Sequence, residues 1–96
     1  MIHALDALGN PIRRGILAAL RRQPLSVNEL AERFPVSRPA ISRHLRVLRE
    51  GGLVEMRAEG ACHQYTVRLR GFAPVREFLD EFWDVALARL AEASKK

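Results

Sequence analysis

The stretch Val36–Val54 reads VSRPAISRHLRVLREGGLV, and it decides the fold. Ser37 is a favoured residue for the N-cap of a helix, and Pro39 is well suited to the first turn, where its missing N–H leaves no bond unmade. The pair Gly51–Gly52 is a typical stop signal. The stretch therefore predicts a helix over residues 38–50.

On a helical wheel, this predicted helix separates into two faces. The apolar face consists of Ile41, Leu45 and Leu48, with Ala40, His44 and Val47 beside them. The opposite face carries Arg38, Ser42, Arg46 and Arg49, with Arg43 at its edge. A helix in the DNA major groove needs this division, because Arg can donate two hydrogen bonds to guanine and can also contact phosphates. The alternative is a surface helix whose arginines are only solvated.

Two helices are predicted near the N-terminus. The first covers residues 2–8, where Ile2, Leu5 and Leu8 align on one side. Gly9 and Asn10 interrupt the pattern. A second helix then begins at Pro11, and its apolar face comprises Ile12, Ile16, Leu17 and Leu20.

A third helix is predicted from the capping-box sequence Ser26–Glu29 to Pro35. Its apolar positions are Val27, Leu30, Ala31 and Phe34. Only Pro35 and Val36 would join it to the helix over residues 38–50. A turn this short lets two helices cross steeply, as in a helix-turn-helix.

The pattern changes after the double glycine. LVEMRAE and CHQYTVR alternate apolar and polar residues around Gly60–Ala61, which predicts a β-hairpin. Gly71 ends that pattern, and a long helix follows over about residues 72–93. The chain is therefore predicted to be mainly α-helical with one small hairpin, a single winged helix-turn-helix domain over residues 1–96.

Composition and charge favour a nucleic-acid partner. The 96 residues carry a net charge of +5, and 48% of them are hydrophobic, as expected of a folded domain. Residues 37–57 hold five arginines against two glutamates, whereas residues 72–93 hold two arginines against five acidic residues. No apolar run approaches the length of a membrane span, and none resembles a signal peptide. We therefore expect a cytoplasmic protein.

The stretches ALGNPIRRGILAAL (7–20), LSVNELAERFPVSRPAISRHLRVLREGGLV (25–54) and VEMRAEGACHQYTV (54–67) resemble the ArsR family of bacterial winged-helix regulators. The resemblance implies a homodimer that pairs through its first and last helices and binds an imperfect palindrome in double-stranded DNA. Such proteins are usually repressors, often of their own operon.

Residue by residue, the resemblance assigns DNA contacts to two segments. The matching positions on the predicted recognition helix are Ser37, Arg38, Pro39, Ser42 and Arg43. On the wing, residues 54–67, the matching positions are Arg57 and His63. Together with Arg46 and Arg49 from the wheel, these residues form the expected DNA-binding set.

The last helix carries a broad apolar stripe, widened by Phe78 and Leu87. The expected dimer interface joins it to the first helix and comprises Ile2, Leu5, Val75, Leu79, Phe82, Trp83, Ala86 and Leu90. The aromatic residues could instead line a ligand pocket. Four exposed aromatics on a monomer would be an unusual patch, so a role in the core and the dimer interface is favoured.

The sequence departs from metal-sensing members of the family. Ser26 and Asn28 stand where those members carry a cysteine pair, and the last helix contains no histidine, so we expect no metal and no cofactor. Cys62 is the only cysteine. It is either a small residue of a strand or a redox switch. The inducer stays unidentified.

Two other classes of function fit the sequence less well. A winged-helix module for protein–protein interaction is the alternative to DNA binding, but the net positive recognition helix argues against it. An enzyme is not expected, because the acidic residues lie on helical faces without a paired nucleophile, a glycine-rich phosphate loop or metal-ligand spacing.

Overall fold

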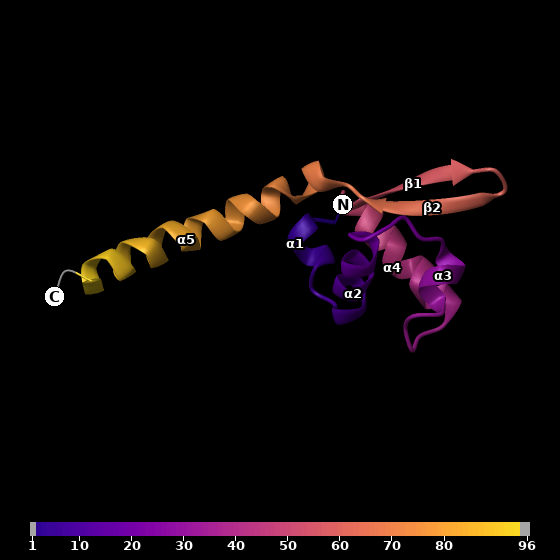
Figure 1. Ribbon diagram of the computed structural model, residues 1–96, viewed down its shortest axis with the longest axis horizontal. Coiled ribbons are helices and arrows are strands. Elements are labelled where there is room, and N and C mark those ends of the chain that lie inside the picture. The colour runs from indigo at the N-terminus through magenta and orange to yellow at the C-terminus, as the bar shows by residue number, and fades with distance from the viewer. Residues whose placement is uncertain (1, 95–96) are drawn as a thin grey trace.

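A computed structural model of the protein describes residues 2–94 (Figure 1). The elements follow one another as α1 (Ala4–Ala7), α2 (Pro11–Leu20), α3 (Val27–Ala31), α4 (Arg38–Glu50), β1 (Val54–Glu59), β2 (Cys62–Val67), the 3-10 helix η1 (Leu69–Phe72) and α5 (Ala73–Ser94). Helices α1 to α4 form the body, the hairpin extends from it to one side, and α5 extends to the other. This arrangement confirms the predicted mainly α-helical winged helix-turn-helix.

The core lies between α2, α3, α4 and the root of the hairpin. Its fully buried large side chains are Ile16, Leu25, Leu30, Ile41, Leu45, Leu48 and Leu53. The apolar faces predicted for α2 and α4 are therefore the faces that the body buries. Burying a side chain of this size stabilises a fold by about 1.5–3 kcal/mol relative to leaving it in water.

The bounds of α4 agree with the prediction because its end signals are all used. The Ser37 hydroxyl accepts a hydrogen bond from the Ala40 N–H at 3.3 Å. At the other end, Gly52 adopts a φ of +77°, and the Leu53 N–H donates to the Leu48 carbonyl at 2.9 Å. These are the features of a Schellman motif, which a residue with a side chain would strain at Gly52.

The predicted end of the third helix is wrong. α3 stops at Ala31, and the segment Glu32–Ser37 joins it to α4, so the connection is longer than Pro35 and Val36. The Arg33 N–H donates to the carbonyl of Leu30, three residues back, which tightens and ends the helix. Phe34 still packs on the core, but from the turn, where its ring lies against Gly15.

The first helix is shorter than the predicted residues 2–8. His3 lies outside α1 and caps it, because its Nδ1 accepts the Leu5 N–H at 3.1 Å. Asn10, which the pattern marked only as a break, caps α2 by accepting the N–H groups of Ile12 and Arg13. Both caps satisfy donors that a helix start leaves free.

The hairpin has the predicted two-residue turn, and its register pairs Glu59 with Cys62 and Met56 with Tyr65. Gly60 has a φ of +60° at the first turn position, as a type II′ turn requires. Leu25 adds one further bridge, exchanging both backbone hydrogen bonds with Tyr65 at 2.8 and 3.2 Å. This bridge fixes the hairpin to the segment that precedes α3.

Helix α5 leaves the body instead of packing in its core. None of its residues is buried, and the side chains from Arg76 onward are exposed. The part of the prediction that placed this stripe in the core of the chain is therefore wrong. Only its first turn, at Val75, packs against the core cluster.

Candidate nucleic-acid interface

The outer face of α4 is exposed. Ile41, Leu45 and Leu48 are at most 1% exposed, whereas the predicted recognition residues lie in water. The exposed set is Ser37, Arg38, Pro39, Ser42, Arg43, Arg46 and Arg49. Within residues 2–94, the single ion pair shorter than 4.0 Å joins Arg76 and Asp80 on α5. The guanidinium groups of α4 are therefore unpaired and available to an anionic partner.

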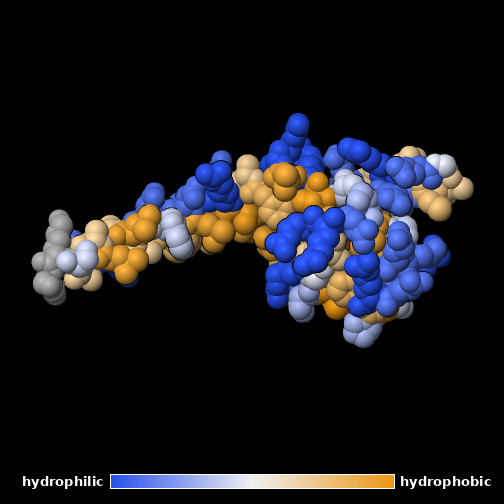
Figure 2. Space-filling model, in the orientation of Figure 1, coloured by the Kyte–Doolittle hydropathy of each residue, from blue (hydrophilic) through white to orange (hydrophobic). Residues whose placement is uncertain are grey.

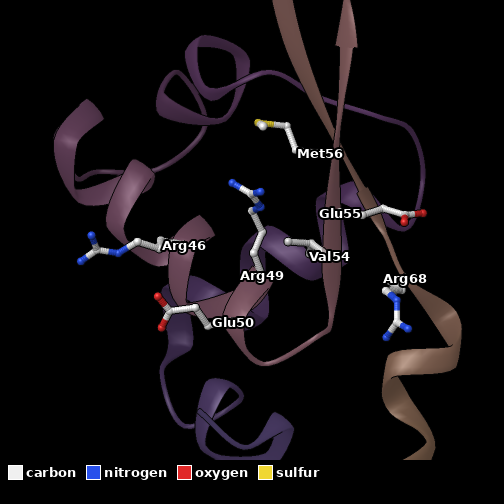
Figure 3. A pocket seen from close by; sticks show the side chains of 7 residues that line it. All are labelled: Arg46, Arg49, Glu50, Val54, Glu55, Met56 and Arg68. Atoms are coloured by element: carbon white, nitrogen blue, oxygen red, sulfur yellow. The ribbon is translucent and has the colours of Figure 1, made fainter. Parts of the chain in front are cut away.

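A hollow of about 550 Å3 separates the C-terminal half of α4 from β1 (Figure 3). Its lining residues are Arg46, Arg49, Glu50, Val54, Glu55, Met56 and Arg68. The side chains of Arg49 and Met56 point into the space between helix and strand, while Arg46 points away from the strand. Arg46 and Arg49 thus face different directions although both are exposed.

A second groove, of about 260 Å3, lies where the hairpin turn approaches the start of α4. Arg38 and His63 both line it, together with Ser26, Val27, Asn28, Ala61, Cys62 and Tyr65. The fold therefore brings one residue of the recognition helix next to one of the wing. Nothing in the local sequence pattern predicts this proximity, because it depends on the bridge between Leu25 and Tyr65.

The two predicted wing residues lie on opposite faces of the hairpin. Side chains directly opposite in an antiparallel pair share a face, and successive residues alternate. His63 pairs with Ala58 and shares the face of Met56 and Tyr65, whereas Arg57 pairs with Gln64 on the other face. Both side chains are exposed, so they can reach a ligand only from different sides of the wing.

His44 occupies the border between the buried and exposed faces of α4. Its Nδ1 lies 3.4 Å from the Nη1 of Arg13, which can only donate, so the contact uses an unprotonated Nδ1. Burial, followed by the nearby charges of Arg13 and Arg43, lowers the pKa of His44 below 6.5. This half-buried position agrees with the predicted place of His44 beside the apolar face, and it fits a packing role.

Two arginines of α2 have structural roles. Arg13 donates from Nε to the carbonyl of Ala7 at 2.7 Å, and Arg14 donates from Nη1 to the carbonyl of Leu8 at 2.7 Å. Both cations therefore satisfy carbonyl groups at the C-terminal end of α1. Neither contacts an acidic group.

Arg68 is a residue that the sequence reasoning missed. Its Nη1 donates to the carbonyl of Gly52, two residues after the end of α4, at 3.2 Å, and its side chain lines the hollow beside Arg49. It is the last residue of the alternating stretch CHQYTVR, and this position was the available signal.

The described residues contain no cluster of three or more His, Cys, Asp or Glu that could hold a metal ion. Cys62 is exposed at the start of β2. None of the helices within residues 2–94 has the length and apolar character of a bilayer span.

An exposed basic helix supported by a capped helix and flanked by a β-hairpin defines a winged helix-turn-helix DNA-binding protein. A family model described as a helix-turn-helix domain matches residues 8–57. HTH-type transcriptional regulator Rv2034 of Mycobacterium tuberculosis is 44% identical over 89 residues, which cover 93% of this chain and 83% of that protein.

The names of two other relatives differ, because one states repression and the other activation. Transcriptional repressor SdpR of Bacillus subtilis is 30% identical over 67 residues, covering 70% of this chain and 74% of its own length. Transcriptional activator HlyU of Vibrio cholerae is 43% identical over 63 residues, covering 66% of this chain and 58% of its own length.

Solved structures of transcriptional regulators have the same fold as this chain. A protein named "Possible transcriptional regulator for arsenical resistance" superposes with a TM-score of 0.80 at 40% identity, covering 96% of both chains. An ArsR-like regulator from Rhodococcus sp. RHA1 has a TM-score of 0.71 at 35% identity, covering 92% of this chain and 86% of its own. The chain belongs to the ArsR family of winged helix-turn-helix regulators. It is a DNA-binding transcriptional regulator and not an enzyme.

Proposed function

We propose that the protein acts as a homodimeric repressor that binds an imperfect palindrome in double-stranded DNA. The observation that carries the proposal is the exposed, unpaired arginine face of α4, directly opposite a fully buried apolar face. A rigid helix with free guanidinium groups on one side can enter a major groove without losing an internal ion pair. Access to DNA implies a cytoplasmic location.

We assign different tasks to different parts of this face. Residues near the start of α4, Arg38, Ser42 and Arg43, are the base-reading group, since the N-terminal part of a recognition helix reaches base edges. Arg46 and Arg49 are assigned to phosphates, and Arg57 and His63 to the DNA beside the wing. Ser37 and Pro39 set the start of the helix and lie at the same surface.

The proposal of a homodimer is based on the exposed apolar side chains of α5. Leu79, Phe82, Trp83 and Leu90 are 56 to 66% exposed, far more apolar surface than a monomer of this size usually presents. The proposed interface also includes Ile2, Leu5, Val75 and Ala86. We divide the single domain accordingly, with DNA binding in the body and hairpin and dimerisation in the two terminal helices.

Footprinting on DNA from directly upstream of the protein's own gene tests the homodimer, and a reporter driven by the same DNA tests repression. We expect two protected half-sites ~34–36 Å apart, or a multiple of that spacing, because a twofold dimer contacts successive turns of one face. A reporter driven by this DNA should be less active when the protein is expressed. A single protected half-site would contradict the dimer, and a more active reporter would favour activation, as named for HlyU, over repression.

A further inference from the structure

The groove between the hairpin turn and the start of α4 contains a polar group that has no partner within the described chain. Tyr65 lines this groove and is only 9% exposed. Its hydroxyl forms no hydrogen bond with another side chain or carbonyl in residues 2–94. Over the same residues, Thr66 Oγ1 is the single buried side-chain polar atom that lacks a partner. Solvent therefore reaches the Tyr65 hydroxyl, through the groove that this residue lines, and the hydroxyl is free to bind a ligand.

The burial of Tyr65 fixes this hydroxyl in place. The backbone of Tyr65 exchanges two hydrogen bonds with Leu25, and the residue pairs with Met56 across the hairpin. A tyrosine held in this way has little rotational freedom left to lose when its hydroxyl binds a ligand. The hydroxyl of a buried tyrosine usually has a hydrogen-bond partner. Its unpaired state here points to a partner outside the chain.

The other polar side chains of the groove can donate hydrogen bonds to the same ligand. His63 shares the hairpin face of Tyr65, Asn28 comes from the first turn of α3, and Arg38 comes from the start of α4. None of the residues that line the groove is acidic. Its volume of about 260 Å3 lies below the ~300–1,000 Å3 of pockets that hold drug-sized ligands. The groove therefore suits a compact oxyanion.

The place of the groove in the fold identifies the source of that oxyanion. In the proposed complex, α4 enters the major groove of DNA and the hairpin lies beside the adjacent minor groove. A sugar–phosphate backbone separates these two grooves, so it passes between the hairpin turn and the start of α4. In the space-filling view, hydrophilic residues predominate on the body below the hairpin, whereas hydrophobic residues follow α5 (Figure 2). The groove thus lies on the side of the molecule that suits a charged backbone.

We propose that Tyr65, His63 and Asn28 bind one phosphate of the DNA backbone in this groove. The inference rests on the proposed mode of DNA binding and deepens it, because it adds Tyr65 and Asn28 to the residues that contact DNA. Arg38 is exposed, so it adds positive charge beside the phosphate and stays available to base edges. Phosphate contacts fix the register of a protein on DNA without reading sequence. The groove therefore sets how α4 and the hairpin are placed on the duplex.

Removal of the hydroxyl alone tests the contact. Tyr65→Phe should weaken binding to the upstream DNA and to a random duplex alike by ~10-fold or more, since a hydrogen bond to a charged group is lost. The log–log salt slope should stay the same, because no cation is removed. Thr66→Val is the matched control, because it removes a hydroxyl from the other face of β2 and should leave the affinity for DNA unchanged. Fluorescence anisotropy measures both variants.

A second variant makes the test independent of the tyrosine. Asn28→Asp places a negative charge in the groove and should weaken binding to both duplexes by ~10-fold or more, because the phosphate is repelled. An acidic residue in the first turn of a helix is favourable, so α3 should be retained. Gln23→Glu makes the same charge change at an exposed residue outside the groove. Its effect should stay below ~3-fold, since salt screens the charge from the DNA.

Neutralised phosphates identify the contact on the DNA. Methylphosphonates replace the phosphates of the footprinted half-site one at a time, and the wild-type protein should lose affinity at each phosphate that it contacts. At one of these positions, Tyr65→Phe should lose clearly less affinity than the wild type, because its contact with that phosphate is already missing. At the other positions the two proteins should lose affinity equally. Equal losses at every position would overturn the contact.

The outcomes separate this inference from the proposed function. A wild-type protein that binds neither duplex refutes the proposed function itself. A wild-type protein that binds DNA no more tightly than Tyr65→Phe overturns the backbone contact alone. Calorimetric binding of inorganic phosphate to the wild type, but not to Tyr65→Phe, would in that case assign the groove to a free anion instead of DNA.

Discussion

Helices α4 and α5 both carry apolar stripes, but only one of them is covered by the chain itself. In α4, Leu45 is 1% exposed and Leu48 is fully buried, whereas in α5 Trp83 is 65% exposed and Leu90 is 66% exposed. The difference shows that an apolar pattern indicates that a surface must be covered, but does not indicate what covers it. The apolar face of α4 stabilises the body and leaves its basic face exposed, while the apolar face of α5 is not covered by the chain and is the proposed dimer interface.

The largest expected effect distinguishes the two stripes. Leu45→Ala removes a fully buried side chain and should lower the free energy of unfolding by about 2–5 kcal/mol. Leu79→Ala makes the same change on the exposed face of α5, and its effect should depend on protein concentration because it acts through the proposed dimer. Urea denaturation at several concentrations measures both. Equal, concentration-independent losses would contradict the comparison.

The second prediction concerns the junction between the two helices. A Cβ added to Gly71 would lie 1.7 Å from the carbonyl oxygen of Gly52, which is two residues after the end of α4. Because backbone must move, Gly71→Ala should destabilise the protein by about 3 kcal/mol. Gly60→Ala, where φ is +60° but no atom lies within 4 Å, should have a smaller effect of ~1–2 kcal/mol. Urea denaturation that ranks Gly60→Ala as the more damaging change would disprove this account of the junction.

The third prediction divides the basic face of α4. Arg43→Ala should reduce discrimination between operator and random DNA by about 1–3 kcal/mol, since it removes a base contact. Arg49→Ala should weaken binding to all sequences similarly and lower the log–log salt slope by ~0.9. Fluorescence anisotropy on both DNAs measures the two effects. Equal losses on both DNAs for Arg43→Ala would rule out its base-reading role.

The smallest expected effect is a pH dependence of the free energy of unfolding, which comes from His44 on α4. The pKa of His44 is lowered in the folded protein, mainly by burial, so the unfolded chain binds a proton more readily below pH 6.5. The free energy of unfolding should therefore fall as the pH drops from about 6.5 toward that lowered pKa. His44→Gln should flatten this dependence in urea denaturation from pH 5 to 8, whereas His63→Gln on the exposed wing should leave it in place.

Much of the body could be predicted because its signals are local. The N-cap Ser37, the early Pro39 and the double glycine after α4 are adjacent to the helix they delimit, and the predicted bounds are those observed. The turn at Gly60–Ala61 was predictable for the same reason. The exposure of the α4 arginines follows from the wheel once the opposite face is buried.

The remaining features depend on contacts between distant residues. Phe34 fits the apolar spacing of α3 yet reaches the core from a turn, so periodicity alone extends the helix too far. The contact between Gly71 and Gly52 and the bridge between Leu25 and Tyr65 have no local signature. The groove shared by Arg38 and His63 follows from that bridge. The dimer interface and the DNA-binding residues stay predictions.

The most direct test of the central claim is fluorescence anisotropy on DNA from directly upstream of the protein's own gene. A scrambled duplex serves as the control, and both are titrated across a series of salt concentrations. A regulator that reads sequence through α4 should bind the upstream DNA ~10³-fold more tightly than the scrambled duplex. The absence of binding to either duplex at low salt would contradict the assignment of the exposed α4 arginines to DNA.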